Sequence, residues 1–224
     1  MSLSQSGTAT LPASQSEGDG LSDTYATSTG ADSEALQPNA VFVNVYDVIN
    51  FNSLFWSIGF GVHHAGIQVY GKEYQYGGCD EGSGIGVVEP LHALPHTFRE
   101  QFYLGQTELS ALAVQELVAN LRQCDTWLGS KYHLVKHNCV HFARALCEAL
   151  LPPARRVAQM RTAPPFIYKS AYTEEVEVDG QRYTVPVLIP PHVDRLGNYA
   201  AAYLPDWALV KLDSSCQPSL PDIA

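Results

Sequence analysis

The sequence predicts an α+β fold, in which an antiparallel sheet packs against helices. Segments with the pattern of β-strands come first along the chain, and segments with helical spacing come after them. The strand candidates are residues 41–48, 64–70, 73–78, 83–90 and 96–105, and the first helix candidates are 108–124 and 139–151. Apolar residues make up 46% of the chain, which is enough for a sizeable core.

Two of the strand candidates are joined by a short turn, which is typical of antiparallel pairing. In the first strand, Val41, Val43 and Val45 alternate with Phe42, Asn44 and Tyr46, which predicts a strand with both faces partly covered. Residues 64–70 and 73–78 predict a hairpin around a tight turn at Gly71-Lys72. The aromatic segment between them and the first strand, residues 49–62, predicts a loop with a short helix.

The helix candidates carry end signals. Thr107 is the predicted N-cap of the first helix, and Asn138 the predicted N-cap of the second. The second helix should run from Cys139 to about residue 151, because two prolines follow it. Residues 132–135 predict a short strand before it. Beyond it, we expect a hairpin around Asp179-Gly180 and a further helix over residues 190–205.

The composition predicts how the chain is divided into tail, domain and end, and it argues against one class of function. Residues 1–39 are polar and predict a disordered tail, residues 40–212 predict one domain, and residues 213–224 predict a frayed end. The net charge of −10, without a basic stripe, argues against nucleic-acid binding. Neither a membrane span nor a secretory signal is expected. Five scattered cysteines without a C-x-x-C pair predict reduced thiols, in the cytoplasm or also the nucleus.

Cys139 is the candidate for chemistry, because it opens a helix. Unpaired N–H groups and the helix dipole favour a thiolate there, which predicts a pKa below the usual value of about 8.5. The same N–H groups could hold an oxyanion. A packed thiol is the alternative that the residues alone leave open. A zinc site from His137, Cys139 and His141 does not fit the usual spacings, so neither a metal nor another cofactor is predicted.

A nucleophilic Cys needs a base, and the chain has eight His. His141 is two helical positions from Cys139 and points roughly 200° around the axis, so a structural role is expected. His63 and His64 start a strand and point to opposite faces. From the residues alone, His64 is equally a strand-end His bonded to the backbone. Asn44 and Tyr46 are candidates for a second oxyanion donor, and no third catalytic residue is evident.

Four ordered blocks, which cover roughly residues 41–151, carry a resemblance. They read "VNVYDV", "GFGVHHAGIQVYGKEYQYGG", "GIGVVEP" and "YHLVKHNCVHFARALCEALL". They resemble the PPPDE family, the permuted papain-fold thiol peptidases also called DeSI-type isopeptidases. The resemblance implies a permuted papain-like fold, with a sheet or small barrel against helices. It implies a catalytic dyad of Cys139 and His64, and removal of ubiquitin or a ubiquitin-like modifier such as SUMO. It also allows a homodimer.

The chain departs from the family pattern at two places. Val140 stands where the family often has Asn, and residues 154–189 predict an insertion that carries the late hairpin. Two other functions stay open. "NCVHF" resembles the N-C-E-H-F motif of lecithin:retinol acyltransferase-like proteins, which implies a lipid acyltransferase or a thioesterase. A non-catalytic binding module is the third possibility.

Overall fold

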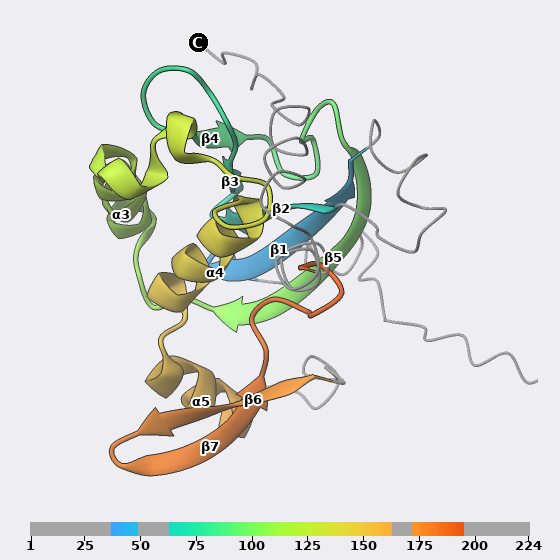
Figure 1. The fold of residues 1–224 in the computed structure, drawn as a ribbon. Helices are drawn as coiled ribbons and strands as arrows, with labels where there is room; N and C mark the ends of the chain where they lie inside the picture. Colours follow the sequence, from blue (N-terminus) through green and yellow to red (C-terminus); the bar gives the residue numbers. More distant parts are fainter. Residues whose placement is uncertain (1–36, 49–62, 163–171, 195–224) are drawn as a thin grey trace, which may run out of the picture.

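The computed structural model describes residues 37–48, 63–162 and 172–194. A five-stranded antiparallel sheet, in the order β4-β3-β2-β1-β5, forms the centre of the fold (Figure 1). Its strands are β1 (Ala40–Asp47), β2 (His63–Val69), β3 (Lys72–Tyr76), β4 (Ile85–Val88) and β5 (Thr97–Gln106). The predicted α+β class and the predicted antiparallel sheet against helices are therefore confirmed.

β2 is paired unequally on its two sides. Residues His63 to Gln68 pair with β1, where His64 lies opposite Tyr46. Its pairing with β3 covers only Ile67 to Val69. Among the described residues, the first half of β2 therefore has no strand partner on the side of β3.

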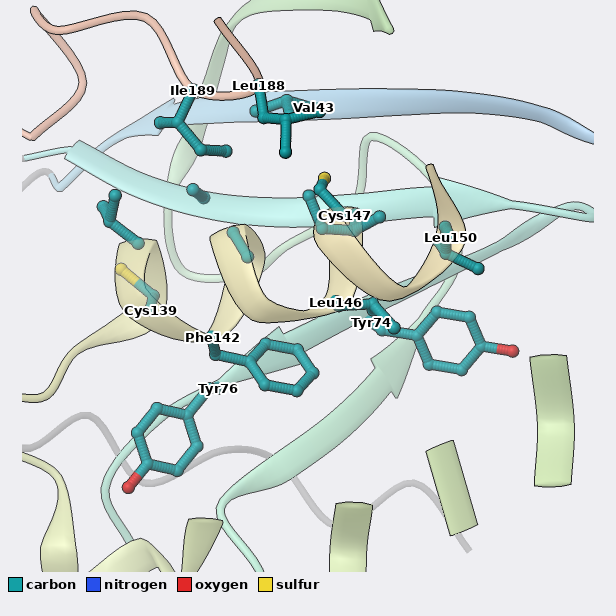
Figure 2. Packing of buried hydrophobic residues seen from close by; sticks show 14 of the residues in the cluster. Val43, Tyr74, Tyr76, Cys139, Phe142, Leu146, Cys147, Leu150, Leu188 and Ile189 are labelled. Carbon is teal, nitrogen blue, oxygen red and sulfur yellow. The ribbon is translucent and has the colours of Figure 1, made fainter. Parts of the chain in front are cut away.

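Helix α4 (Cys139–Leu150) packs on one face of this sheet, against β2 and β3. Odd-numbered residues of β1 and β2 supply that face of the core, as do Tyr74 and Tyr76 of β3. Among the helix residues of this core, Figure 2 labels Cys139, Phe142, Leu146, Cys147 and Leu150. The opposite face of the same strands carries polar residues, which are Asn44, His64, Gln68, Glu73 and Gln75.

The remaining elements lie around this centre. Helix α3 (Ala111–Gln123) and the 3-10 turns Asp125–Trp127 and Gly129–Lys131 precede α4. Helix α5 (Pro153–Thr162) contacts the separate hairpin of β6 (Thr173–Val178) and β7 (Gln181–Pro186), away from α3 in Figure 1. Arg156 of α5 is buried and pairs with Glu174 at 2.6 Å, which ties the helix to the hairpin. No helix in the described ranges has the length and hydropathy to cross a bilayer.

Two predicted helix and strand boundaries are wrong. Ser110, not Thr107, caps α3, and its Oγ accepts a hydrogen bond from the Ala113 amide at 3.2 Å. Thr107 instead accepts a bond from the Leu109 amide, which holds the turn before the helix. Residues 132–135 form no strand, because the backbone of His133 bonds to that of His137 and closes a turn.

Both hairpin turns use residues with positive φ. The first turn lies at Tyr70-Gly71, one residue earlier than predicted, with φ of 51° and 70°. The second lies at Asp179-Gly180, as predicted. Helix α5 was not predicted. The expected loop at 49–62, the tail up to residue 36, the end from residue 213 and most of the expected helix at 190–205 lie outside the described residues.

Candidate active site

Asn138 caps α4, as predicted, and its side chain both accepts and donates hydrogen bonds. Its Oδ1 accepts hydrogen bonds from the amides of Val140 at 2.9 Å and His141 at 3.2 Å. The His141 ring accepts the Asn138 amide in return, and Asn138 Nδ2 donates to the Leu134 carbonyl at 2.6 Å. The expected structural role of His141 is confirmed. Two of the N-terminal amides of the helix are therefore already bonded.

The sulfur of Cys139 lies at the free edge of β2. The thiol is 3.9 Å from the carbonyl oxygen of His63, and it also hydrogen-bonds with the backbone of Ala65. The carbonyl of one strand residue and the amide two residues later point to the same edge. For residues 63 and 65 this is the edge that β3 leaves unpaired. The sulfur thus lies against the edge of β2, beside the backbone that carries His64.

The prediction of a lowered pKa for Cys139 is wrong for this state of the protein. The side chain is only 3% exposed, and burial raises the pKa of the thiol to about 11. Hydrogen bonds from Ala65, Tyr132 and Val140 act in the opposite direction but do not compensate, and the charge of Asp194 raises the pKa further. The helix terminus alone therefore does not ionise this thiol.

The two neighbouring His lie on opposite faces of β2, as strand alternation predicts. His63 shares the face of Ala65, which packs against α4, and its Nδ1 lies 3.2 Å from Asp47 Oδ1. His64 lies on the polar face. The structure thus places Cys139 beside the segment of β2 that contains both His63 and His64. The sulfur forms no hydrogen bond with either imidazole ring among the described residues.

His64 is buried among polar and aromatic groups. Its ring lies 4.9 Å from that of His96 and 6.2 Å from that of Tyr46, measured between centroids. Burial lowers the pKa of His64, while a hydrogen bond with the Gln75 side chain and the charge of Glu73 raise it. Its Nε2 is buried and has no hydrogen-bond partner among the described residues.

Glu73 is the centre of this polar face. The side chain is completely buried, and it accepts hydrogen bonds from four groups. They are Asn44 Nδ2 at 2.5 Å, Tyr46 Oη at 2.7 Å, Gln75 Nε2 at 2.7 Å and the Leu91 amide at 3.0 Å. Asn44 and Tyr46 are therefore bonded to Glu73, on the face opposite to α4, and they do not serve as the oxyanion donors that the sequence suggested.

His63 lies in a second charged group. Burial lowers its pKa, as does the charge of Arg99, while Asp47 raises it. Glu100 lies nearby and bonds to His192 at 2.8 Å. Because His63 faces the helix side of the sheet and has a carboxylate beside it, it is a second candidate for the base.

Three residues near the site were not predicted from the sequence. Glu73 and Gln75 lie in a strand beside a turn, where polar residues normally face solvent, and Tyr132 lies in a turn before the Cys motif. The alternation of β3 places Glu73 and Gln75 on the face of His64, and this signal was available. The approach of the Tyr132 hydroxyl to the sulfur depends on the fold of residues 124–138, and no pattern indicated it.

The other motifs have structural roles. Cys147 is fully buried in the core, as predicted, and burial raises its pKa. The ring of His137 stacks on that of Trp127 at 4.8 Å, with Tyr76 beside it. No group of three metal-binding side chains occurs in the part of the chain that the structure describes.

Comparisons with known proteins identify the family of the chain. Residues 39–162 match the family model described as "PPPDE putative peptidase domain", which includes α5 and ends before the β6–β7 hairpin. The chain is 32% identical over 170 residues to the desumoylating isopeptidase 1 homolog of Caenorhabditis elegans, over 71% of this chain and 48% of that protein.

Two further relatives carry DeSI-like names. A DeSI-like protein of Arabidopsis thaliana is 34% identical over 114 residues, which is 50% of this chain and 49% of that protein. The DeSI-like protein sdu1 of Schizosaccharomyces pombe is 31% identical over 111 residues, which is 47% of this chain and 54% of that protein. The chain spans about half the length of the curated relatives it matches. Because the family model covers more than half of the chain, the chain belongs to the PPPDE peptidase family, with DeSI-like relatives.

Proposed function

We propose that this protein is a cysteine isopeptidase that removes a ubiquitin-like modifier, with SUMO as the first candidate. Cys139 is the nucleophile and His64 the base. One observation carries the proposal: in a domain of a peptidase family, the sulfur at the start of α4 lies against the strand segment that holds His64. The choice of SUMO over ubiquitin follows the name of the C. elegans relative.

The reaction is nucleophilic acyl transfer. His64 Nε2 takes the thiol proton as the sulfur attacks the carbonyl carbon of the isopeptide bond. The tetrahedral intermediate then breaks the C–N bond, and the lysine amine leaves with the proton from His64. Water attacks the resulting thioester, which releases the modifier with a free carboxylate and restores the thiol. Family membership also implies the permuted papain-like fold for this site.

The oxyanion of the intermediate needs donors that the N-cap does not occupy. The amide of Cys139 is one, and the hydroxyl of Tyr132, which acts on the sulfur by lowering its pKa, is the other. Hydrogen-bond donors beside the sulfur stabilise the negative charge that develops on the carbonyl oxygen of the intermediate. Both residues lie close to the reacting atom in the sequence, so the site needs no donor from the first strand.

An electrophilic SUMO probe tests the nucleophile and the base together. We expect Cys139→Ala to lose covalent labelling completely and His64→Gln to lose most of it. His63→Gln is the matched control, because it removes the neighbouring imidazole on the other face of β2. Labelling of Cys139→Ala at the normal rate would reject the nucleophile. If His63→Gln loses labelling and His64→Gln retains it, the base is instead His63, assisted by Asp47.

The same variants separate the two other functions that the sequence left open. A thioesterase or lipid acyltransferase would release acyl groups from an S-acylated peptide faster than it cleaves a SUMO isopeptide, and the release would also require Cys139. A binding module would retain SUMO without cleaving it, and Cys139→Ala would bind equally well. A ubiquitin probe used in parallel decides the modifier, and gel filtration of the active protein tests for a homodimer.

A further inference from the structure

We propose that an exposed apolar patch beside His64 binds the lysine-bearing partner of the isopeptide substrate and favours apolar residues next to the modified lysine. The patch consists of Leu91, Leu94 and Phe98, which are 40%, 72% and 40% exposed. Exposed apolar side chains of this size are few in the described part of the chain, and half of those that occur there belong to this patch. The inference rests on the proposed function, because it takes His64 as the base.

The segment that carries the patch covers the polar face of the sheet. β4 and β5 form the opposite edges of the sheet, so residues 89–96 must cross one of its faces. The amide of Leu91 donates to Glu73 Oε2, which belongs to the polar face, at 3.0 Å. Further along the segment, the ring of His96 lies 4.9 Å from that of His64, measured between centroids. The inner side of the segment therefore lies against the proposed base.

The patch is held in place by the backbone of the segment. Hydrogen bonds between backbone groups order it, such as that from the His96 amide to the Ala93 carbonyl at 2.9 Å. Leu91 has a φ of 66°, a conformation that bulky residues rarely adopt. Its amide is bonded to a buried carboxylate, while its side chain is exposed. A surface of this kind needs little reordering when a partner binds.

The patch is continuous with the surroundings of His64. Phe98 lies at the start of β5, and its ring is 5.9 Å from that of Tyr46 in an edge-to-face arrangement. The ring of Tyr46 lies in turn 6.2 Å from that of His64. Two side chains, His96 and Tyr46, therefore connect the base to the segment and to Phe98. A chain bound at His64 would continue over this surface.

The proposed reaction decides which half of the substrate lies here. His64 Nε2 returns the proton to the lysine nitrogen as the C–N bond breaks, so this nitrogen must lie within hydrogen-bond reach of the ring. The acyl half is bonded to the sulfur, and its oxygen lies at the Cys139 amide, at the start of α4. The chain that carries the lysine therefore leaves the site on the side of His64. An apolar residue next to the lysine would bury its surface against the patch, which stabilises the bound substrate.

Two reactions with the same modifier separate the two halves of the substrate. An electrophilic SUMO probe labels Cys139 without a lysine-bearing chain, whereas SUMO joined to a lysine peptide includes one. We expect the double variant Leu91→Ser, Leu94→Ser to lower kcat/KM about tenfold for a peptide with leucine next to the lysine, mainly through KM. The probe should label this variant at the normal rate. Leu94→Ser alone is a second variant with the same expected direction, because this side chain is the most exposed of the patch.

A control variant and a control peptide complete the design. Leu112→Ser removes a leucine that is 65% exposed on α3, and it should change neither reaction. A second peptide has serine in place of the leucine next to its lysine. The unaltered protein should cleave it about tenfold more slowly than the leucine peptide, and the double variant should cleave both at similar rates.

Three results would overturn the inference. The first is equal cleavage of the two peptides by the unaltered protein, or an unchanged preference in the double variant. The second is a loss of probe labelling as large as the loss of cleavage, which would mean that the patch binds the modifier. The third is a smaller apparent mass of the variant in gel filtration, which would mean that the patch joins two copies of the chain. The failure of the proposed function looks different, because the unaltered protein would then neither react with the probe nor cleave either peptide, and the inference would be overturned with it.

Discussion

The reactivity of Cys139 towards a small alkylating reagent tests the reasoning about burial. The thiolate is the reactive form, so the rate follows the ionised fraction. Burial raises the pKa of this thiol from 9.0 to about 11, and each pH unit changes the ionised fraction tenfold. At neutral pH the native protein should therefore react with iodoacetamide roughly a hundredfold more slowly at Cys139 than the same residue in the unfolded chain. Limited access, at 3% exposure, slows it further.

Mass spectrometry of each cysteine peptide over a pH range of about 6 to 10 measures this rate. The rate at Cys139 should rise tenfold per pH unit through the whole range, without a plateau. Cys124, which is exposed, provides the internal reference for reagent consumption. The SUMO probe should react with Cys139 far faster than iodoacetamide does, because the bound probe places its electrophile beside the sulfur and excludes water. A rate with iodoacetamide that is fast and level below pH 7 would refute the reasoning, since it would mean that the thiolate already exists.

Three further predictions follow from the same geometry. Gly66→Ala should destabilise the protein by about 1–3 kcal/mol in urea unfolding, because the new methyl group must displace the Glu73 carboxylate; a loss below about 0.5 kcal/mol would contradict the close packing. Tyr132→Phe should lower kcat about 10²–10³-fold with unchanged folding if its hydroxyl holds the oxyanion, and an unaltered kcat would remove it from the mechanism. Stability should fall as the pH rises above about 8.5, because the folded-state pKa of Cys147 is raised: the unfolded chain loses this proton first. Urea midpoints at neutral and alkaline pH measure this, and Cys147→Ala should reduce the slope, to which the raised pKa of Cys139 also contributes; an unchanged slope would contradict it.

The sheet could be predicted from the sequence because its signals are local. Alternating residues such as Val41, Val43 and Val45 mark a strand whatever it pairs with, and Asp179-Gly180 marks a hairpin turn by its backbone preference. The cap at Asn138 was equally local, since its side chain bonds within its own turn. Local sequence signals did not identify the N-cap where two residues could both serve as one. Thr107 and Ser110 both precede the first helix, and the hydrogen bond of Thr107 to the turn decided between them.

The candidate site was less predictable, because its properties arise from burial. Glu73 is a charged residue beside a turn, which normally indicates an exposed position. It is buried because donors from β1, β3 and the segment before β5 converge on it, and these lie far apart in the sequence. The pKa of Cys139 was mispredicted for the same reason. The helix terminus was correctly identified, but the surrounding core that outweighs it is formed by distant residues.

These two buried groups together determine how the proposed reaction must begin. The pKa of the thiol is about 11, and burial holds the pKa of His64 below 6.5. Transfer of the proton from Cys139 to His64 in the resting protein is therefore unfavourable, because burial raises the pKa of the donor and lowers the pKa of the acceptor. A thiolate–imidazolium pair is therefore scarcely populated before substrate binds, and proton transfer has to accompany the attack on the carbonyl. In such a step, the position and tautomer of the base matter more than its charge.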